Sequence, residues 1–311
     1  MSMLDLLIFL FSLLVVVKAA DSAIRYSSTL ADALHLSKHV VGFLIVAGIS
    51  VLPETLISIQ SAFQGIPSFG VGTLFGSNVA DLSLVFALVL LFAGGKGLKV
   101  ESKVLKDQYW YFLGLAIPLI LGYNGFYSRW EGVAMILTGV LFHLYALKRD
   151  KQEIKKVKVK FSYKSLGFLL ASMALLLLGS HFTVESGVQV AAALHISPIL
   201  VGMFFVGVGT TLPELIFAIK AAKKHFDSLA LGDVLGTVMT DATIVMGIVA
   251  IIQPFTFDKR LVHLTGFYML FAAVLLFYFM QSGRVLKKKE GLFLFAFYLL
   301  FVFTELITQQ A

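Results

Sequence analysis

Long runs of apolar residues, separated by short polar stretches, recur along the whole chain of 311 residues. A run of about 20 apolar residues is long enough to cross the hydrocarbon core of a bilayer. Inside lipid the backbone must satisfy its own hydrogen bonds, so each run is predicted to be helical. The pattern predicts an all-α membrane protein with ten transmembrane helices. The predicted segments are 3–20, 39–63, 69–94, 108–122, 130–147, 165–183, 197–221, 227–253, 262–280 and 291–308.

Composition supports the same fold class. Hydrophobic residues make up 59% of the chain, charged residues make up only 14%, and the mean hydropathy is +0.91. The chain contains no cysteine, which excludes disulfides and thiolate metal sites. The stretch 1–17 lacks the basic start and the small-residue cleavage site of a signal peptide, so it is predicted to belong to the first helix.

Lys and Arg residues are distributed unevenly between the predicted loops. If the N-terminus is outside, 22 of the 25 lie in cytoplasmic loops, and only Arg129, Lys259 and Arg260 lie outside. Because cytoplasmic loops are enriched in Lys and Arg, this predicts a multi-pass plasma-membrane protein with both termini extracellular. Topology then accounts for the net charge of +7 without a nucleic-acid partner. The lipid bilayer is the expected surrounding, and no obligate protein partner is expected.

The chain contains an internal repeat at an offset of 160 residues. Residues 31–85 give 18 identities in 55 positions, including Pro53/Pro213. Five predicted helices per copy is an odd number, so the second copy must enter the membrane from the opposite side. Such inverted repeats are typical of secondary transporters, which bind substrate near the bilayer midplane. The predicted organisation is a first repeat at 1–147 (motif 41–88), a basic cytoplasmic linker at 148–164, and a second repeat at 165–311 (motif 201–248).

Four acidic residues lie inside apolar runs and are related by this repeat: Glu54 with Glu214, and Asp81 with Asp241. A carboxylate near the bilayer centre is costly, so its presence indicates a function. Each Glu follows Leu-Pro, and proline interrupts a helix because it lacks an N–H and clashes with the carbonyl four residues earlier. The first break is predicted near Ser50. Freed carbonyls, hydroxyls and carboxylates are hard oxygen ligands that suit Na⁺ or Ca²⁺.

Hydroxyl residues and glycines accompany the two Asp residues. Ser77 precedes Asp81 by four positions, and Thr237 precedes Asp241 by four, so each pair shares a helix face. Small-x-x-x-small strips are predicted to let helices approach closely. These strips are formed by Gly72 with Gly76 and by Gly232 with Gly236.

The segments Gly209–Glu214 (GTTLPE) and Gly76–Asp81 (GSNVAD) resemble the two halves of the repeat signature of the sodium/calcium exchanger family, within the cation/calcium antiporter superfamily. The resemblance covers essentially the whole chain and implies a prokaryotic-type exchanger. It implies alternating-access transport of Ca²⁺ and Na⁺, with no cofactor and no enzymatic reaction. By this resemblance Glu54 and Glu214 bind Ca²⁺ with backbone oxygens near Ser50 and Thr210. Hydroxyls and the carbonyls of Ala47 and Gly207 complete the Na⁺ sites. The expected ion-binding residues are Ser50, Glu54, Ser77, Asp81, Thr210, Thr211, Glu214, Thr237 and Asp241.

Two departures from the family pattern affect these sites. Val51 stands where the second copy has Thr211, so it cannot supply a hydroxyl. Asp81 stands where many relatives carry Asn, which gives the site four carboxylates. Four neighbouring negative charges cannot all ionise without cations, so a proton is a candidate co-substrate or resident. Exchange of H⁺ for Ca²⁺, or for another divalent cation, therefore stays open beside Na⁺/Ca²⁺ exchange.

Two other function classes were weighed. A cation channel also uses rings of acidic residues, but an inverted repeat with broken helices favours a transporter. The stretch 230–233 (ALGD) nearly reproduces the Gly-x-Gly-Asp of intramembrane aspartyl proteases, yet the other elements of that group are missing. Asp233 is interpreted instead as a helix cap or a charge of the cytoplasmic vestibule. His35 and His195 are interpreted as structural, and Glu305 is unassigned.

Overall fold

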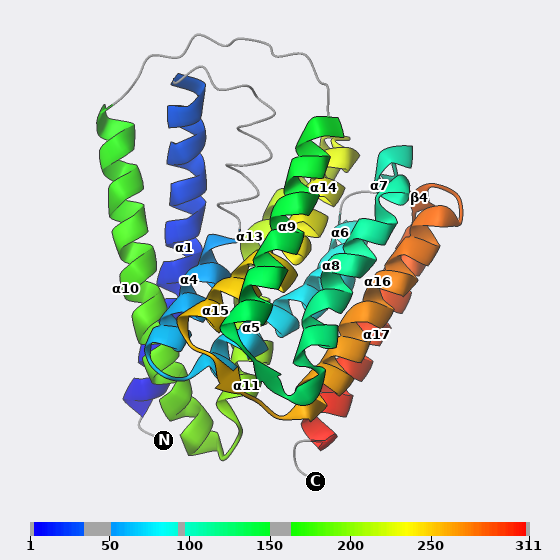
Figure 1. Cartoon of the computed structure of the whole chain (residues 1–311). Helices are drawn as coiled ribbons and strands as arrows, with labels where there is room; N and C mark the ends of the chain where they lie inside the picture. The colour runs from blue at the N-terminus through cyan, green and yellow to red at the C-terminus, as the bar shows by residue number, and fades with distance from the viewer. Residues whose placement is uncertain (1–2, 34–50, 93–96, 150–162, 309–311) are drawn as a thin grey trace.

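The structure, a computed structural model, describes residues 3–33, 51–92, 97–149 and 163–308, and these residues are mostly helical (Figure 1). The first half contains α1 (Met3–Ala33), α4 (Leu52–Phe63), α5 (Pro67–Ala80), η2 (Asp81–Val85), α6 (Phe86–Phe92), β1 (Leu98–Lys99), α7 (Ser102–Lys106), α8 (Gln108–Leu121), η3 (Gly122–Asn124), β2 (Phe126–Tyr127) and α9 (Arg129–Arg149). The second half contains α10 (Tyr163–Leu194), α11 (Pro198–Leu200), η4 (Val201–Val206), α12 (Gly207–Thr210), α13 (Leu212–Lys223), α14 (Asp227–Thr240), η5 (Asp241–Val245), α15 (Met246–Ile252), β3 (Phe255–Thr256), η6 (Leu261–Thr265), α16 (Gly266–Gln281), β4 (Val285–Leu286) and α17 (Lys288–Thr308).

Seven stretches of helix in the described part of the chain are long and apolar enough to cross a membrane. They are Leu4–Ala23, Pro67–Phe92, Tyr163–Leu194, Pro198–Lys223, Asp227–Ile252, Val262–Gln281 and Lys288–Thr308. Helices α8 and α9 also lie where the fourth and fifth segments were predicted. Of the predicted segment 39–63, the structure describes only the part from residue 51 onward. The prediction of a multi-pass helical membrane protein is confirmed.

Two helices are longer than the apolar segments that predicted them. Helix α1 continues past residue 20 to Ala33, and α10 continues past residue 183 to Leu194. In the extension of α10, small and apolar residues such as Gly187 and Ala191 stay buried at helical spacing. One buried face is enough to stabilise a helix whose other face is polar, and hydropathy alone does not register it.

The end of α10 explains the role of His195. This residue has φ +56°, in the left-handed region, and Ile196 donates a backbone hydrogen bond to the Ala191 carbonyl at 3.0 Å. That geometry is a C-terminal helix cap. The structural interpretation of His195 is consistent with it, while His35 lies outside the described residues.

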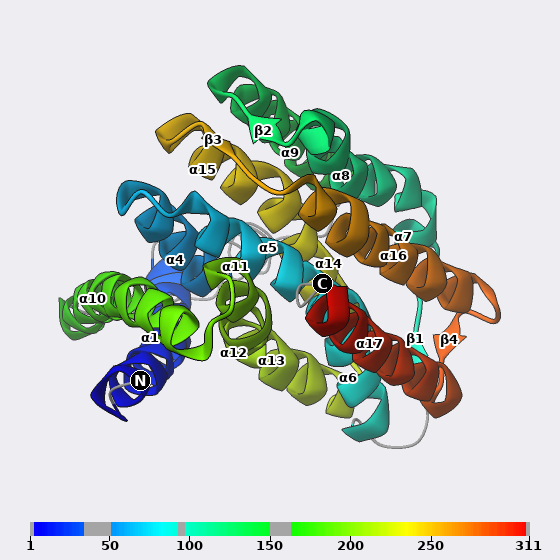
Figure 2. The same cartoon turned by 90° about the horizontal axis from the view of Figure 1, so that it is seen from below.

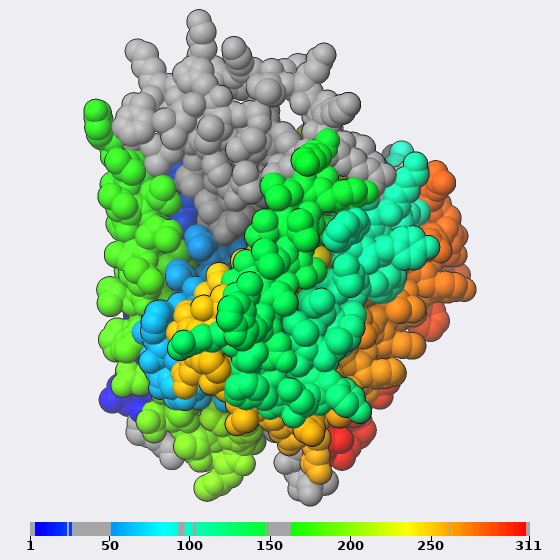
Figure 3. Space-filling view, viewed as in Figure 1, coloured from blue at the N-terminus to red at the C-terminus, as the bar shows by residue number. Residues whose placement is uncertain are grey.

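Helices α1 and α10 pack together at one edge of the molecule (Figure 2). Their approach is close because Gly179 has no side chain: a Cβ there would lie 2.8 Å from a methyl carbon of Val16. Across the same contact Thr183 Oγ1 donates to Ser12 Oγ at 3.0 Å. The pair shares a small apolar core with residues such as Phe69, and the remaining helices surround a separate, larger core. Figure 3 shows α8 and α9 side by side over the face seen there, with α10 at its edge.

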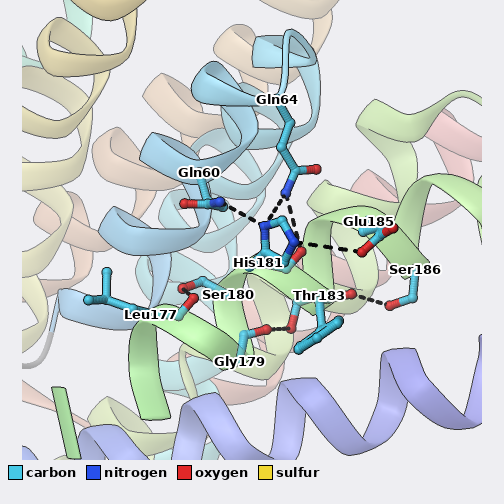
Figure 4. Close-up of polar contacts among 10 residues, drawn as sticks. Gln60, Gln64, Leu177, Gly179, Ser180, His181, Thr183, Glu185 and Ser186 are labelled. Atoms are coloured by element: carbon cyan, nitrogen blue, oxygen red, sulfur yellow. Dashed lines mark hydrogen bonds and ion pairs between the residues drawn. The ribbon is translucent and has the colours of Figure 1, made fainter. Parts of the chain in front are cut away.

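Polar contacts also connect α10 to α4 (Figure 4). His181 Nδ1 lies 2.9 Å from Gln60 Nε2 and 3.1 Å from Gln64 Nε2. Gln64 also donates to the His181 carbonyl at 3.3 Å, and Glu185 Oε2 lies 3.8 Å from His181 Nε2. These contacts join the α1–α10 pair to the helix that carries Glu54.

Four short strands form two antiparallel ladders, and each ladder joins one strand from each half of the chain. In one, β1 pairs with β4, with Leu98 opposite Leu286. In the other, β2 pairs with β3, with Phe126 opposite Thr256. The ladders lie at opposite ends of the molecule, β4 near the top of Figure 1 and the green and gold arrows of β2 and β3 near the bottom. Helix α1 begins and α17 ends at the β2–β3 end, whereas α9 ends and α10 begins at the other.

Helix α5 crosses the segment formed by α11 and η4 at very close range. A Cβ on Gly72 would lie 2.2 Å from the Ile199 carbonyl oxygen, and one on Gly76 would lie 2.2 Å from the Met203 carbonyl oxygen. From the opposite side, a Cβ on Gly202 would lie 2.3 Å from the Phe69 carbonyl oxygen. The predicted small-residue strip is confirmed for the first copy. For the second copy, a Cβ on Gly232 would meet nothing within 4 Å in the described part of the chain, and the close approach there stays a prediction.

Candidate functional site

The two Leu-Pro-Glu segments form matching helix breaks. Val51 has φ −76° and ψ −2°, Thr211 has φ −78° and ψ −4°, and a new helix begins directly after each. The proline occupies the second position of each new helix, where its missing N–H would be unpaired in any case. This places Glu54 and Glu214 in the first turns of α4 and α13, each only 1% exposed. The predicted break is confirmed in the second copy. In the first copy the described part begins at Val51 itself.

The two Asp residues begin matching π-helical turns, which the sequence analysis did not predict. Helix α5 passes into η2 at Asp81, and α14 passes into η5 at Asp241. In each turn a hydroxyl two residues later bonds a carbonyl of the preceding turn: Ser83 donates to Val79, and Thr243 donates to Met239 at 2.6 Å. π-Helical turns inside α-helices occur frequently at functional sites. The hydroxyls of Ser83 and Thr243, at matching positions of the repeat, are the sequence feature that accompanies these turns.

These breaks and turns bring the four carboxylates together. Asp81 and Asp241 are fully buried. The four acids lie close enough for their negative charges to repel one another. Ser77 Oγ lies 3.4 Å from Asp241 Oδ2, which connects α5 of the first half with η5 of the second. The predicted convergence of acids from both copies at one buried location is therefore observed. We call Glu54, Asp81, Glu214 and Asp241 the carboxylate cluster.

Six of the eight oxygens of the carboxylate cluster have no hydrogen-bond partner among the residues that the structure describes. They are Glu54 Oε2, both oxygens of Asp81, both oxygens of Glu214, and Asp241 Oδ1. An ionised carboxylate buried without partners is strongly destabilising, so these acids are expected to carry protons or to bind cations. Among the described residues no three Asp, Glu or His side chains are grouped tightly enough to hold one metal ion by themselves. A cation at this location would find hydroxyl and backbone oxygens as additional ligands.

Hydroxyls of the expected ligand set line the same helices. Thr210 Oγ1 donates to the Gly207 carbonyl at 3.1 Å, and Thr211 Oγ1 donates to the Val208 carbonyl at 2.9 Å. A hydroxyl that donates to its own helix still has oxygen lone pairs for a cation. Ser77 does the same toward Leu74 at 3.1 Å.

The positions of three further expected ligands, and of one residue that was not expected, are as follows. Thr237 is buried in α14, one turn before Asp241. Ser50 and the Ala47 carbonyl lie outside the described residues. Asn78, which the sequence analysis did not single out, is buried beside Ser77, and its Oδ1 has no hydrogen-bond partner in the part of the chain that the structure describes.

Two further buried acids have different surroundings. Asp233 is not a helix cap, because it lies in the second turn of α14, which begins at Asp227. It is 6% exposed, and its charge acts on Glu54, Asp81 and Glu214. Glu305 in α17 accepts a hydrogen bond from Thr265 in η6 and is not among the groups that act on the cluster.

The model of the family described as "Sodium/calcium exchanger protein" matches residues 4–148 and 164–307, which is nearly the whole chain. The chain belongs to the sodium/calcium exchanger family. Family membership confirms the resemblance carried by the two repeat motifs. It assigns a transporter that exchanges cations, rather than a channel or an intramembrane protease.

Known proteins resemble this chain over most of its length. Sodium/calcium exchanger MaX1 of Methanosarcina acetivorans is 25% identical over an alignment of 344 positions, covering 96% of this chain and 97% of the relative. The solved structure of the sodium-calcium exchanger NCX_Mj has a TM-score of 0.69 at 23% identity, covering 97% of this chain and 99% of its own. The H⁺/Ca²⁺ exchanger CAX has a TM-score of 0.78 at 19% identity, covering 97% and 82%. The two structures establish the shared fold, and the family establishes a cation/Ca²⁺ antiporter.

Proposed function

We propose that this protein exchanges Na⁺ for Ca²⁺ by alternating access at the carboxylate cluster. The observation that carries the proposal is the set of six unpaired carboxylate oxygens, contributed by α4, η2, α13 and η5 to one buried location. A transported cation supplies the counter-charge that these oxygens require. A resident structural ion pair would instead show basic side chains, and no Lys or Arg is buried in the described part of the chain.

Specific ligands follow from the positions of the oxygens. Glu54 and Glu214 occupy equivalent first turns and would bind Ca²⁺ together, with backbone oxygens near Ser50 and Thr210. Ca²⁺ takes about six to eight oxygen ligands, more than two carboxylates supply, so backbone groups have to contribute. The hydroxyls of Ser77, Thr211 and Thr237, with carbonyls such as those of Ala47 and Gly207, would complete the Na⁺ sites. The negative charges of Asp81 and Asp241 would determine how much positive charge the bound ions have to supply.

The fold supports a transport cycle based on two inverted repeats. We propose ten transmembrane helices, in halves 1–147 and 165–311 joined by the linker 148–164. Matched helix breaks, matched π-helical turns and two inter-half ladders at opposite ends are what an inverted pair of halves would produce. Because the site lies between the halves, a movement of the α1–α10 pair against the remaining helices would open it to one side at a time.

Exchange of H⁺ for Ca²⁺ is the second candidate, and Asp81 is the observation that favours it. Both Asp81 oxygens are buried, and within the described part of the chain neither has a hydrogen-bond partner. One Ca²⁺ neutralises only two of the four charges of the cluster. Either Na⁺ or protons must neutralise the others, and the two candidates differ in which ion does so.

Transport measurements in proteoliposomes would separate these candidates. We expect ⁴⁵Ca²⁺ uptake to be driven by an outwardly directed Na⁺ gradient and to be little changed by a pH gradient of the same size. Uptake driven by the pH gradient alone would replace Na⁺ with H⁺ in the proposal. If no gradient of Na⁺, K⁺ or H⁺ drives uptake, Ca²⁺ exchange itself is wrong.

The same assay tests the central ligands. Glu54→Gln and Glu214→Gln should each abolish uptake, because each removes a charged ligand while keeping the shape of the side chain. Glu290→Gln serves as the matched control, since Glu290 is an acid at the start of α17 that bonds the Lys287 backbone outside the cluster. A folded Glu54→Gln protein with wild-type uptake would exclude this residue from the site.

A further inference from the structure

We propose that Asp233 is a fifth ion-contacting carboxylate, which binds cations on their path between the carboxylate cluster and the β1–β4 end of the molecule. This inference rests on the proposed function and adds to it a difference between the two sides of the membrane. Neither the repeat nor the four-carboxylate site requires such a residue.

The position of Asp233 on α14 supports this role. Asp233, Thr237 and Asp241 follow one another at intervals of four residues, so they share one helix face. At a rise of 1.5 Å per residue, Asp233 lies about 12 Å along the axis from Asp241. The beginning of α14 contacts the β1–β4 ladder, because the Lys99 backbone N–H donates to Asp227 Oδ2 at 2.9 Å. Asp233 therefore lies on the β1–β4 side of the cluster.

The surroundings of Asp233 connect it to the site rather than to the surface. Its side chain is 6% exposed, and its charge repels those of Glu54, Asp81 and Glu214. Both oxygens of Asp81 and of Glu214 lack hydrogen-bond partners among the described residues, so the cluster that Asp233 adjoins is expected to hold protons or cations. Asp233 adds a fifth carboxylate on this face of α14, so a cation approaching the cluster along that face would meet it before the other four.

The charge of Asp233 has no counterpart in the first half of the internal repeat. The residue that matches Asp233 in the first half is Thr73, a buried residue whose hydroxyl donates to the Phe69 carbonyl at 3.1 Å. Under the proposed inversion of the halves, Thr73 lies on the β2–β3 side of the cluster. One side of the site then has an additional carboxylate where the other has a neutral hydroxyl. Ca²⁺ should consequently bind with higher apparent affinity from the β1–β4 side, which the charge distribution assigns to the cytoplasm.

The test is the half-saturating Ca²⁺ concentration for transport, measured separately from each side in right-side-out and inside-out membrane vesicles. Asp233→Asn keeps the shape of the side chain and removes its charge. From the β1–β4 side this variant should raise the half-saturating concentration about three- to tenfold, as expected for loss of a unit charge at an effective dielectric of about 20 with partial screening. From the β2–β3 side the value should stay close to that of the wild type.

Two further variants make the result specific. Asp233→Thr installs the residue that the first half carries at the matching position, and it should give the same one-sided loss if Asp233→Asn does not fold. Asp227→Asn removes an acidic charge near the beginning of the same helix, outside the cluster, and should change neither side.

The proposal is overturned if Asp233→Asn and Asp233→Thr change both sides equally, or change neither. It is also overturned if Asp227→Asn reproduces the effect, because the charge would then act only as part of the general surface potential. Failure of the proposed function looks different: the wild type itself would then show no Ca²⁺ transport from either side.

Discussion

At the scale of single residues, charge balance limits what the carboxylate cluster can bind. The structure places Asp81 fully buried in the cluster, and neither of its oxygens has a hydrogen-bond partner among the described residues. Ca²⁺ neutralises two of the four charges, so the occupied site retains a charge of −2 unless further ions bind. Protons and monovalent cations would compete for this remainder, and lower pH would favour the proton.

Replacing Asp81 with Asn should therefore alter the pH dependence of transport more than its rate. The variant removes one group that a proton can occupy, so Ca²⁺ uptake should keep its maximal rate. It should lose part of the decrease that the wild type shows as the pH falls from neutral to mildly acidic. Uptake of ⁴⁵Ca²⁺ across this pH range is the measurement, and Asp258→Asn, at an exposed acid before η6, is the control. An unchanged pH profile, with K⁺ also without effect, would show that Asp81 has no part in charge compensation.

At the scale of helices and strands, some features follow from the local sequence, whereas others depend on how the helices pack against one another. The helix break before Glu214 was predictable because Pro213 lacks an N–H and clashes with the carbonyl four residues earlier, which disfavours a continuous helix. The π-helical turns at Asp81 and Asp241 were not, because the energy difference between α and π geometry in one turn depends on neighbouring helices. The length of α10 was also underestimated, since its last three turns are stabilised by one buried face rather than by a continuous apolar run.

The crossing of α5 with η4 is an element-scale feature that a single methyl group should disturb. Gly76→Ala would place a Cβ 2.2 Å from the Met203 carbonyl oxygen, a backbone atom that cannot rotate away. We expect a loss of stability of about 1–3 kcal/mol, as for other overpacked interiors. The thermal unfolding midpoint in detergent measures it. Gly167→Ala on α10, where a Cβ would meet nothing within 4 Å, is the matched control and should not lower the midpoint. Equal midpoints for the two variants would mean that the crossing is not tightly packed.

At the scale of the whole molecule, the repeat and the charge distribution predict how the protein is oriented. The acids that meet in the cluster could be paired from sequence because the 160-residue offset is regular. How the helices lie against one another could not, since hydropathy does not encode packing, and the pairing of α1 with α10 became visible only in the structure. The β1–β4 end carries basic residues such as Lys99, Lys288 and Lys289, whereas Arg129, Lys259 and Arg260 lie near the β2–β3 end.

This asymmetry predicts that the β1–β4 end faces the cytoplasm, because Lys and Arg are retained on that side during insertion. The chain has no cysteine, so single-cysteine variants need no prior substitutions. Tyr123→Cys lies just before β2 at a position that is 69% exposed, and Ser282→Cys lies at an exposed position just before β4. In intact cells a membrane-impermeant thiol reagent should label Tyr123→Cys and leave Ser282→Cys unlabelled until the membrane is permeabilised. The reverse pattern would invert the orientation, and with it the side from which Asp233 acts. Labelling of both in intact cells would mean that the two ladders do not lie on opposite faces of the membrane.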